Sequence, residues 1–303
     1  MRLQFIVVLL LAALVATTHA LKFPPSETVD VLPQRFLRRD HTYNDEERGA
    51  ATLLEKVKRV FPSKITDKTL QRWANDKKSS KQALTRLKLD NSGTNLFEKR
   101  EFGSWVTFMT KRHPNNPEEA MLSYLMTKYS DGVLTQMIIK AKSAASTTAS
   151  TKEAVTKMQS EQLRLWAKQG KSSHDVFDFY KLNKVKAKTL DDLVGDPQYS
   201  TWAQYVDDIS GKDPDKAKSM MAKTLTTYYT DQGLYSMLGA AKNVESTKKL
   251  ATDLQKAQIA NWFANKADPK DVFRWVGASG NSVEKGVWRT YRDNFNAQYI
   301  VRL

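Results

Sequence analysis

The sequence has 303 residues, no cysteine, and 48 Lys and Arg against 33 Asp and Glu, which gives a formal net charge of +15. Without cysteine there are no disulfides, so each folded part must be held together by apolar burial, for which seven Trp, eleven Tyr and twelve Phe provide large side chains. The basic excess is compatible with a nucleic acid, an anionic membrane or an acidic protein as partner. It is also compatible with a solvated lysine-rich surface, and the scattered positions of the lysines favour this interpretation.

Residues 1–20 have the pattern of a secretory signal peptide. Arg2 precedes an apolar run that is too short for a comfortable membrane span, and the small residues Thr18 and Ala20 stand at the two cleavage positions. We expect cleavage after Ala20, with an uncleaved anchor as the alternative. No later stretch is apolar enough to cross a bilayer, so the mature protein is expected to be soluble.

Residues 21–49 are predicted to form a disordered leader, because they are polar, contain prolines and have no helical period. A basic motif and an acidic motif lie in this leader. Their residues are Arg35, Phe36, Leu37 and Arg38, and then Asp45, Glu46, Glu47 and Arg48. Taken alone, such a basic cluster is commonly a solvated charge or a protease site. The order of signal, basic motif and acidic motif is more informative than any one of them.

From residue 50 onward the apolar residues recur at helical spacing, and a set of aromatic positions recurs in the same order along the chain. The repeated positions are Leu70, Trp73, Trp105, Tyr129, Leu163, Trp166, Trp202, Tyr229, Ile259, Trp262 and Trp288. We predict an all-α fold with a first unit at 50–152, a second at 153–256 and a partial third at 257–303. The third unit has Trp288 but no following helix pair with the repeated Tyr. Each Trp and Tyr is expected to be a core residue first.

Local signals mark the helix ends inside each unit. Six and seven residues after the first Trp of each copy stand Ser79-Ser80, Ser172-Ser173 and Asp268-Pro269, which are good helix starts. A later pair of segments matches at an offset of one hundred residues and places Asp131 and Asp231 in the turn between two helices. Long helices are then expected from Ser143 to Ala167 and from Val244 to Phe263. The alternative for residues 144–148 is a flexible linker.

The sequence offers little for catalysis. Outside the signal its histidines are His41, His113 and His174, and it has neither a cysteine nucleophile nor a glycine-rich phosphate loop. His174 and Asp178 are expected to be a polar pair at a helix start. We therefore predict no enzyme activity, no cofactor, no metal and no small-molecule substrate.

The signal, the motif at 35–38, the motif at 45–48 and the repeat that follows together resemble the RXLR–dEER secreted effectors of oomycete plant pathogens. The repeat resembles the WY and LWY modules of that family. The resemblance implies tandem helical bundles in a linear array, with Trp105 packed against Tyr129 and Trp202 against Tyr229. For the leader motifs it implies a role in secretion or delivery, either through phosphoinositide contact or through cleavage before export.

The resemblance also implies a function. The protein is expected to be a virulence effector that enters plant cells, binds a host protein in the cytoplasm or nucleus, and suppresses immunity. Within the family, a WY unit followed by an LWY unit can form a platform for the host protein phosphatase 2A core, which makes its scaffold subunit the specific candidate partner. The alternative is an effector whose basic surface binds nucleic acid in the host nucleus or anionic lipid at membranes.

Overall fold

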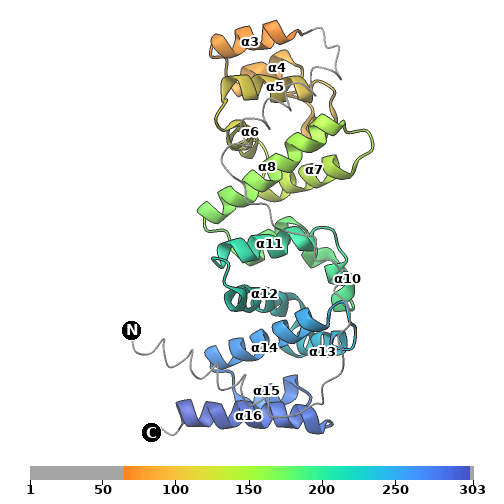
Figure 1. Cartoon of the computed structure of the whole chain (residues 1–303), viewed down its shortest axis with the longest axis vertical. Coiled ribbons are helices and arrows are strands. Elements are labelled where there is room, and N and C mark those ends of the chain that lie inside the picture. The colour runs from red at the N-terminus through yellow and green to blue at the C-terminus, as the bar shows by residue number, and fades with distance from the viewer. Residues whose placement is uncertain (1–64, 301–303) are drawn as a thin grey trace, which may run out of the picture. The chain divides into compact units, whose positions relative to one another are not determined.

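The structure is a computed structural model that describes residues 65–300. Within that range every regular element is a helix, which confirms the predicted all-α class (Figure 1). None of the helices there is both long and apolar enough to cross a membrane. The predicted signal peptide at 1–20 and the leader at 21–49, with both of its charged motifs, lie outside the described residues.

The chain divides into two compact units. The described part of the N-terminal unit comprises residues 65–185 and 196–209, and that of the C-terminal unit comprises residues 186–195 and 210–300. The repeat boundaries near residues 152 and 256 follow the sequence period and stay a prediction.

Helix α5 is the centre of the N-terminal unit. It is apolar on nearly all sides, as expected of a helix that is covered by others, and Phe102, Trp105 and Phe108 are each fully buried. Helices α3, α4, α6 and α8 all pack against it. The helices of this unit are α3 (Asp67–Asn75), α4 (Ser80–Arg86), η2 (Gly93–Glu98), α5 (Phe102–Arg112), α6 (Pro117–Met126), α7 (Asp131–Ser143), α8 (Ala149–Lys168), α9 (Ser173–Phe179), η3 (Leu182–Lys184) and α11 (Tyr199–Ile209).

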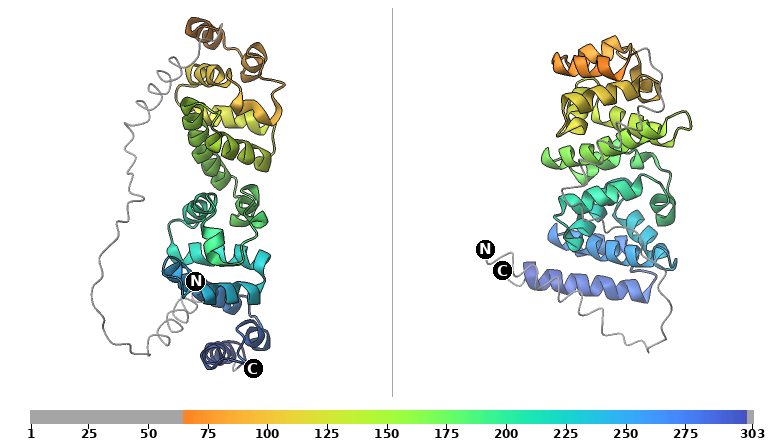
Figure 2. Two further views of the ribbon diagram at one scale, coloured as in Figure 1. Left: turned by 90° about the vertical axis from the view of Figure 1, so that its right-hand side faces the viewer. Right: turned by 45° about the horizontal axis from the view of Figure 1, so that its top comes forward.

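Helix α14 has the corresponding central role in the C-terminal unit, where α12 and α13 pack against it and α13 also contacts α10 and α15. The helices of this unit are α10 (Leu190–Val194), α12 (Pro214–Tyr229), α13 (Asp231–Ala241), α14 (Lys248–Ala264), α15 (Pro269–Trp275) and α16 (Ser282–Tyr299). Helix α16 is one uninterrupted helix (Figure 2). It packs against α15 around the buried rings of Phe263 and Tyr291, in a core cluster that the residues of the predicted partial third unit share with Tyr235 of α13.

The predicted helix starts are confirmed at the three turns that follow the first Trp of each copy. Ser79 and Ser172 each form a capping box, with Gln82 and Asp175 respectively as the reciprocal partners. In the third copy Asp268 accepts from the N–H of Lys270, and proline takes the first helical position. The sequence therefore fixes these turns through the caps themselves.

The two long helices begin later than predicted. Helix α8 starts at Ala149 instead of near Ser143, and α14 starts at Lys248 instead of Val244. Before α8 the backbone of Ala144 is extended (φ −65°, ψ 132°), and the Thr148 hydroxyl accepts from the N–H of Thr151 at 3.2 Å. Serine and threonine side chains bond to nearby backbone groups, so a stretch rich in them favours a cap over a helix interior.

Candidate functional site

The second Trp of each copy is tied to the capped turn of the same copy by one hydrogen bond. In each case the indole N–H donates to the backbone carbonyl of the residue seven positions after the first Trp. The pairs are Trp105 with Ser80 (3.3 Å), Trp202 with Ser173 (2.7 Å) and Trp288 with Pro269 (2.8 Å). This bond satisfies the polar atom of a buried indole and fixes the second Trp helix relative to the turn.

A second bond strengthens this arrangement in two of the copies. The hydroxyls of Tyr205 and Tyr291 donate to the carbonyls of Lys171 and Ala267, at 2.7 and 2.8 Å. Burial raises the pKa of Tyr205 to about 12, with a further contribution from the charge of Asp175. The first copy has Phe at the equivalent position, which is buried in the same way but offers no hydroxyl.

The first Trp of the later copies has an acidic partner. The indole N–H of Trp166 donates to Asp131 Oδ1 at 3.0 Å in the N-terminal unit, and Trp262 donates to Asp231 Oδ1 in the C-terminal unit. Both aspartates lie in the first turn of a helix, α7 and α13 respectively, where a carboxylate is favoured by the helix dipole. We call these two arrangements the N-terminal and the C-terminal Asp–Trp sites.

Each first Trp also has a neighbour thirteen residues further along the chain. The ring of Phe179 lies 4.9 Å from that of Trp166, and the ring of Trp275 lies 5.2 Å from that of Trp262. In the first copy the equivalent residue is Arg86, whose guanidinium carbon lies 5.3 Å from the centroid of Trp73.

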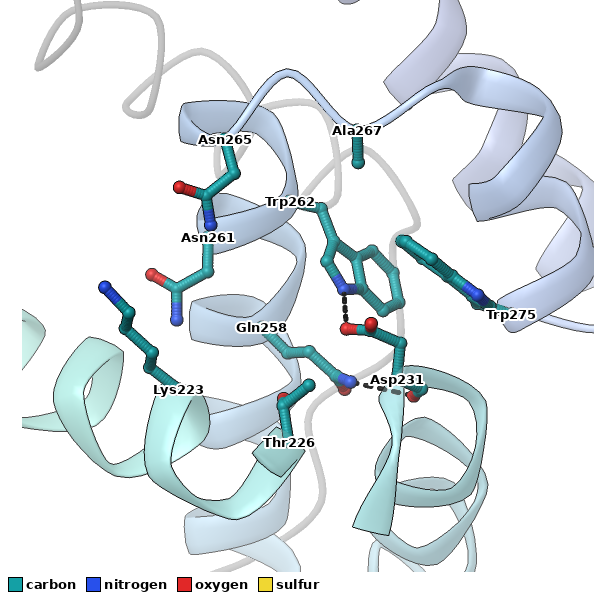
Figure 3. Close-up of a pocket in the computed structure, with 9 residues that line it drawn as sticks. All are labelled: Lys223, Thr226, Asp231, Gln258, Asn261, Trp262, Asn265, Ala267 and Trp275. Atoms are coloured by element: carbon teal, nitrogen blue, oxygen red, sulfur yellow. Dashed lines mark hydrogen bonds between the residues drawn. The ribbon is translucent and has the colours of Figure 1, made fainter. Parts of the chain in front are cut away.

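The two Asp–Trp sites differ in what covers the carboxylate. In the N-terminal site the ammonium of Lys171 lies 3.2 Å from Asp131 Oδ2 and 5.7 Å from the centroid of Phe179. The residue equivalent to Lys171 in the C-terminal site is Ala267. A pocket of about 220 Å³ is found there (Figure 3). Its lining includes Lys223, Asp231, Gln258, Trp262, Ala267 and Trp275.

The predicted packing of Trp105 against Tyr129 and of Trp202 against Tyr229 stays a prediction, and Tyr129 packs against the core cluster that contains Trp105. Tyr129 is partly buried, its hydroxyl donates to the carbonyl of Gly93 at 2.8 Å, and burial raises its pKa. The aromatic neighbours of Trp105 are Phe102 and Tyr124, at 5.6 and 6.1 Å.

The remaining repeat positions lie in or against the cores. Leu70, Leu163 and Trp166 are buried, and Ile259 packs against the aromatic cluster of the C-terminal unit. Burial, together with the charge of Asp192, raises the pKa of Tyr229. That these positions carry the repeat core as a set stays a prediction.

The predicted polar pair of His174 and Asp178 lies at the surface, at the start of α9. His174 Nε2 is 3.7 Å from Asp178 Oδ2, and both side chains are about 40% exposed. Among the described residues no group of three or more His, Cys, Asp or Glu side chains is placed to hold a metal.

Sequence reasoning passed over the roles of Asp131 and Asp231. Both were visible as matched positions one hundred residues apart, but only the fold shows that each accepts from a Trp of a later helix. The identical offset and the helix-start context were the available signals. An alignment of the copies on their first Trp also shows that Ala267 stands where the earlier copy has Lys171. The sequence does not show that this position faces the carboxylate of the matched aspartate.

Comparisons with known proteins agree with the architecture. A family model described as RXLR phytopathogen effector protein, with avirulence activity, matches residues 2–114. RxLR effector protein PexRD25 of Phytophthora infestans is 52% identical over 249 residues, which cover 82% of this chain and 78% of the relative. RxLR effector protein PSR2 of Phytophthora sojae is 33% identical over 98% of this chain, which spans 46% of that relative's length.

A solved structure shows the same fold. The crystal structure of PcRxLR12 superimposes with a TM-score of 0.55 and 29% sequence identity, over 81% of this chain and 57% of the other. The helical units with their tryptophan turns and the extent of the match to PexRD25 lead to one conclusion. The chain belongs to the RxLR effector family, whose members are secreted virulence proteins that are translocated into host cells.

Proposed function

We propose that this effector is an adaptor that binds one host protein inside the plant cell and thereby suppresses immunity. The observation that carries the proposal is that five of the six repeated Trp residues donate their indole N–H within their own unit, either to a backbone carbonyl or to Asp131 or Asp231. The repeat is thus a scaffold, and recognition is left to positions that differ between copies. The protein acts by binding and not by catalysis.

The arrangement of charges supports a localised recognition surface. Several lysines of the described chain are engaged by acidic neighbours, and these pairs reduce the uniformly basic character of the surface. Examples are Lys111 with Asp67 (3.3 Å), Lys140 with Glu98 (2.6 Å) and Lys171 with Asp131 (3.2 Å). A protein that binds nucleic acid or anionic lipid through its whole surface gains nothing from such neutralisation.

In its specific form the proposal names the protein phosphatase 2A core as the partner, held through its scaffold subunit. The support is the order of the repeats, a WY-type unit followed by an LWY-type unit, which resembles the family arrangement that forms a platform for this phosphatase. The match to PSR2 over 98% of the chain shows that the whole repeat region is shared with a larger effector.

The test is affinity purification of tagged residues 21–303 from plant cells, with the bound proteins identified by mass spectrometry. The lysate is divided and washed at about 0.1 M and about 0.4 M salt, because phosphate contacts are lost steeply with salt and a packed protein interface is not. A matched variant, Lys248→Ala with Lys249→Ala, removes two exposed lysines (61% and 92%) from the first turn of α14.

The expected result is one host protein that remains stoichiometric at both salt concentrations and in the double variant. A phosphatase scaffold subunit would establish the specific form. Ribosomes, chromatin or lipid that are lost at the higher salt, and lost earlier in the double variant, would contradict the adaptor and establish the basic-surface alternative. A host protein that is chemically altered without being retained would indicate an enzyme.

A further inference from the structure

The pocket in the C-terminal unit lies where α12, α13, α14 and α15 meet, and its walls combine one carboxylate with two indole rings (Figure 3). Asp231 projects from the start of α13, Trp262 from α14 and Trp275 from α15. The two rings lie 5.2 Å apart at an angle of 44° and form the apolar side of the pocket. Such a site has the features of an aromatic cage with a single anionic wall.

The N-terminal Asp–Trp site shows which chemical group binds between an aspartate and an aromatic ring of this kind. There Lys171 contributes an ammonium group 3.2 Å from the Asp131 carboxylate, and the same group lies over the face of Phe179. Lys171 and Phe179 follow Trp166 by five and thirteen residues, and Ala267 and Trp275 follow Trp262 by the same intervals. The C-terminal site has therefore lost the lysine and gained a larger ring.

Within the described residues the loss leaves one oxygen of Asp231 without an ion pair, whereas the unpartnered amide oxygen of Gln258 has a counterpart in Gln162 of the N-terminal site and does not depend on the loss. Asp231 Oδ1 accepts from Trp262, while Oδ2 has no ion-pair partner within residues 65–300. Gln258 is 1% exposed; its Nε2 donates to the backbone carbonyl of Asp231 at 2.8 Å, and its Oε1 has no hydrogen-bond partner in the described chain. The acceptor that distinguishes the C-terminal site is therefore the carboxylate oxygen of Asp231, because the amide oxygen of Gln162 is also unpartnered, among the residues that the structure describes, in the site that Lys171 fills.

Lys223 is the one cationic residue among the side chains that line the described pocket. Figure 3 shows it on the far side of Gln258 from Asp231, with its ammonium pointing away from the carboxylate. It does not take the position that Lys171 has in the other site. The charge next to the indole rings is therefore that of Asp231.

We propose that this pocket receives a lysine or arginine side chain of the host partner, in the position that Lys171 occupies in the N-terminal site. The carboxylate of Asp231 binds the cation, and the face of Trp275, the aromatic ring type that binds cations best, covers it. Ala267 is the residue that makes room. The proposal rests on the proposed adaptor function for the identity of the partner, but the chemistry of the pocket can be tested without one.

The first experiment follows the indole N–H signals of residues 21–303 labelled with ¹⁵N-tryptophan, of which the chain has seven. The probes are the N-acetyl, N′-methylamide derivatives of lysine and arginine. The norleucine derivative is the control, because it has the same carbon stem as lysine without the ammonium. The cationic probes are expected to shift the signals of Trp262 and Trp275, and to leave Trp166, whose site is filled by Lys171, unchanged.

Two variants sharpen the titration. Asp231→Asn keeps an acceptor for the Trp262 indole but removes the charge, and should weaken binding of the lysine probe by about tenfold. Ala267→Lys should abolish binding, because it restores the side chain that fills the N-terminal site, and it should leave the melting temperature unchanged or raised. Equal shifts with the norleucine probe, or no shift at all in the wild-type chain, would overturn the proposal.

The same variant tests the docking of the partner in plant cells. Ala267→Lys is expected to lose the host protein that the wild-type chain retains, while Lys171→Ala is expected to keep it. Retention of the same host protein by Ala267→Lys would refute docking through this pocket and leave the adaptor function intact. If the wild-type chain retains no host protein, the adaptor function fails by itself, and the titration still decides whether the pocket binds a cation.

Discussion

The two Asp–Trp sites have the same framework and different contents. In both, an aspartate at a helix start accepts from the indole of a Trp on a later helix, and a second ring covers that Trp. The N-terminal site is closed by its own lysine, and the C-terminal site is open because alanine stands at that position. The comparison teaches that both sites keep the same hydrogen bond between an aspartate and an indole, and that the exchange of lysine for alanine at one position leaves a pocket beside the carboxylate.

The largest loss of stability is expected from removing a buried Trp whose indole joins two helical segments by a hydrogen bond; we call these tryptophans and their hydrogen bonds the frame. Trp202 is fully buried, and its indole donates to Ser173 at 2.7 Å. Trp202→Ala should reduce the free energy of unfolding by about 3–5 kcal/mol, a large fraction of the stability of a small helical unit. Urea denaturation followed by circular dichroism measures this loss. Trp275→Ala, at a half-buried position, is the control, and an equal loss in both variants would contradict the distinction between frame and contents.

A smaller effect is expected at the second hydrogen bond of the frame. Tyr205→Phe removes the bond to Lys171 but keeps the ring, as Phe108 does naturally in the first copy. The cost should be about 0.5–1.5 kcal/mol, measured by the same denaturation. Because the pKa of Tyr205 is raised to about 12, its phenol should also remain neutral in an alkaline titration well past the ordinary value near 10. Ionisation of Tyr205 at that ordinary value would show that the hydroxyl is not buried as described.

The two aspartates should respond differently to the loss of charge. Asp131→Asn breaks the ion pair with Lys171, whose side chain is 33% exposed, so the loss should be at most about 1 kcal/mol. Asp231→Asn breaks no ion pair within the described chain and keeps an acceptor for its Trp, so it should cost less. Thermal melting of both variants at low and high salt separates them. Both variants lose the interaction of a carboxylate with its helix dipole, but the Asp131 effect should shrink more with salt because it also includes the ion pair with Lys171. An equal and salt-independent loss would contradict the difference in contents.

The smallest effect concerns the capped turns. Hydrogen bonds from Ser172, first from its backbone N–H and then from its hydroxyl, lower the pKa of Asp175. Its contribution to stability is therefore fully present above the unfolded pKa and is lost as the pH falls through the lower folded value. The equivalent cap at Ser79 uses the uncharged Gln82 and should not titrate. Asp175→Asn should flatten the acid limb of the melting temperature against pH, and Gln82→Ala should leave its shape unchanged.

Much of the frame could be predicted from the sequence. The helical period and the three capped turns are local or periodic signals, and the structure confirms the helices and these turns. Helices α8 and α14 begin later than the sequence predicts. At α8 the cause is the side chain of Thr148, which caps the helix at Thr151. The pairing of Trp166 with Asp131 joins residues 35 positions apart, and no local rule specifies which buried donor meets which acceptor.

The contents of the sites were less predictable for the same reason. That Lys171 covers Asp131, and that Ala267 leaves Asp231 uncovered, depends on where two helices bring side chains together. Aligning the copies on their first Trp shows the exchange of lysine for alanine, but only the fold shows that the exchange opens a pocket.

The most direct test of the account is to exchange the contents of the two sites in one chain. The double variant Lys171→Ala with Ala267→Lys should open the N-terminal site and close the C-terminal one without altering the frame. In the ¹⁵N-indole titration with the lysine derivative, the response should then move from Trp262 to Trp166 while the melting temperature stays close to that of the wild type. A response that remains at Trp262, or that disappears from both sites in a folded chain, would contradict the claim that this one position decides whether an Asp–Trp site is filled from within or from a partner.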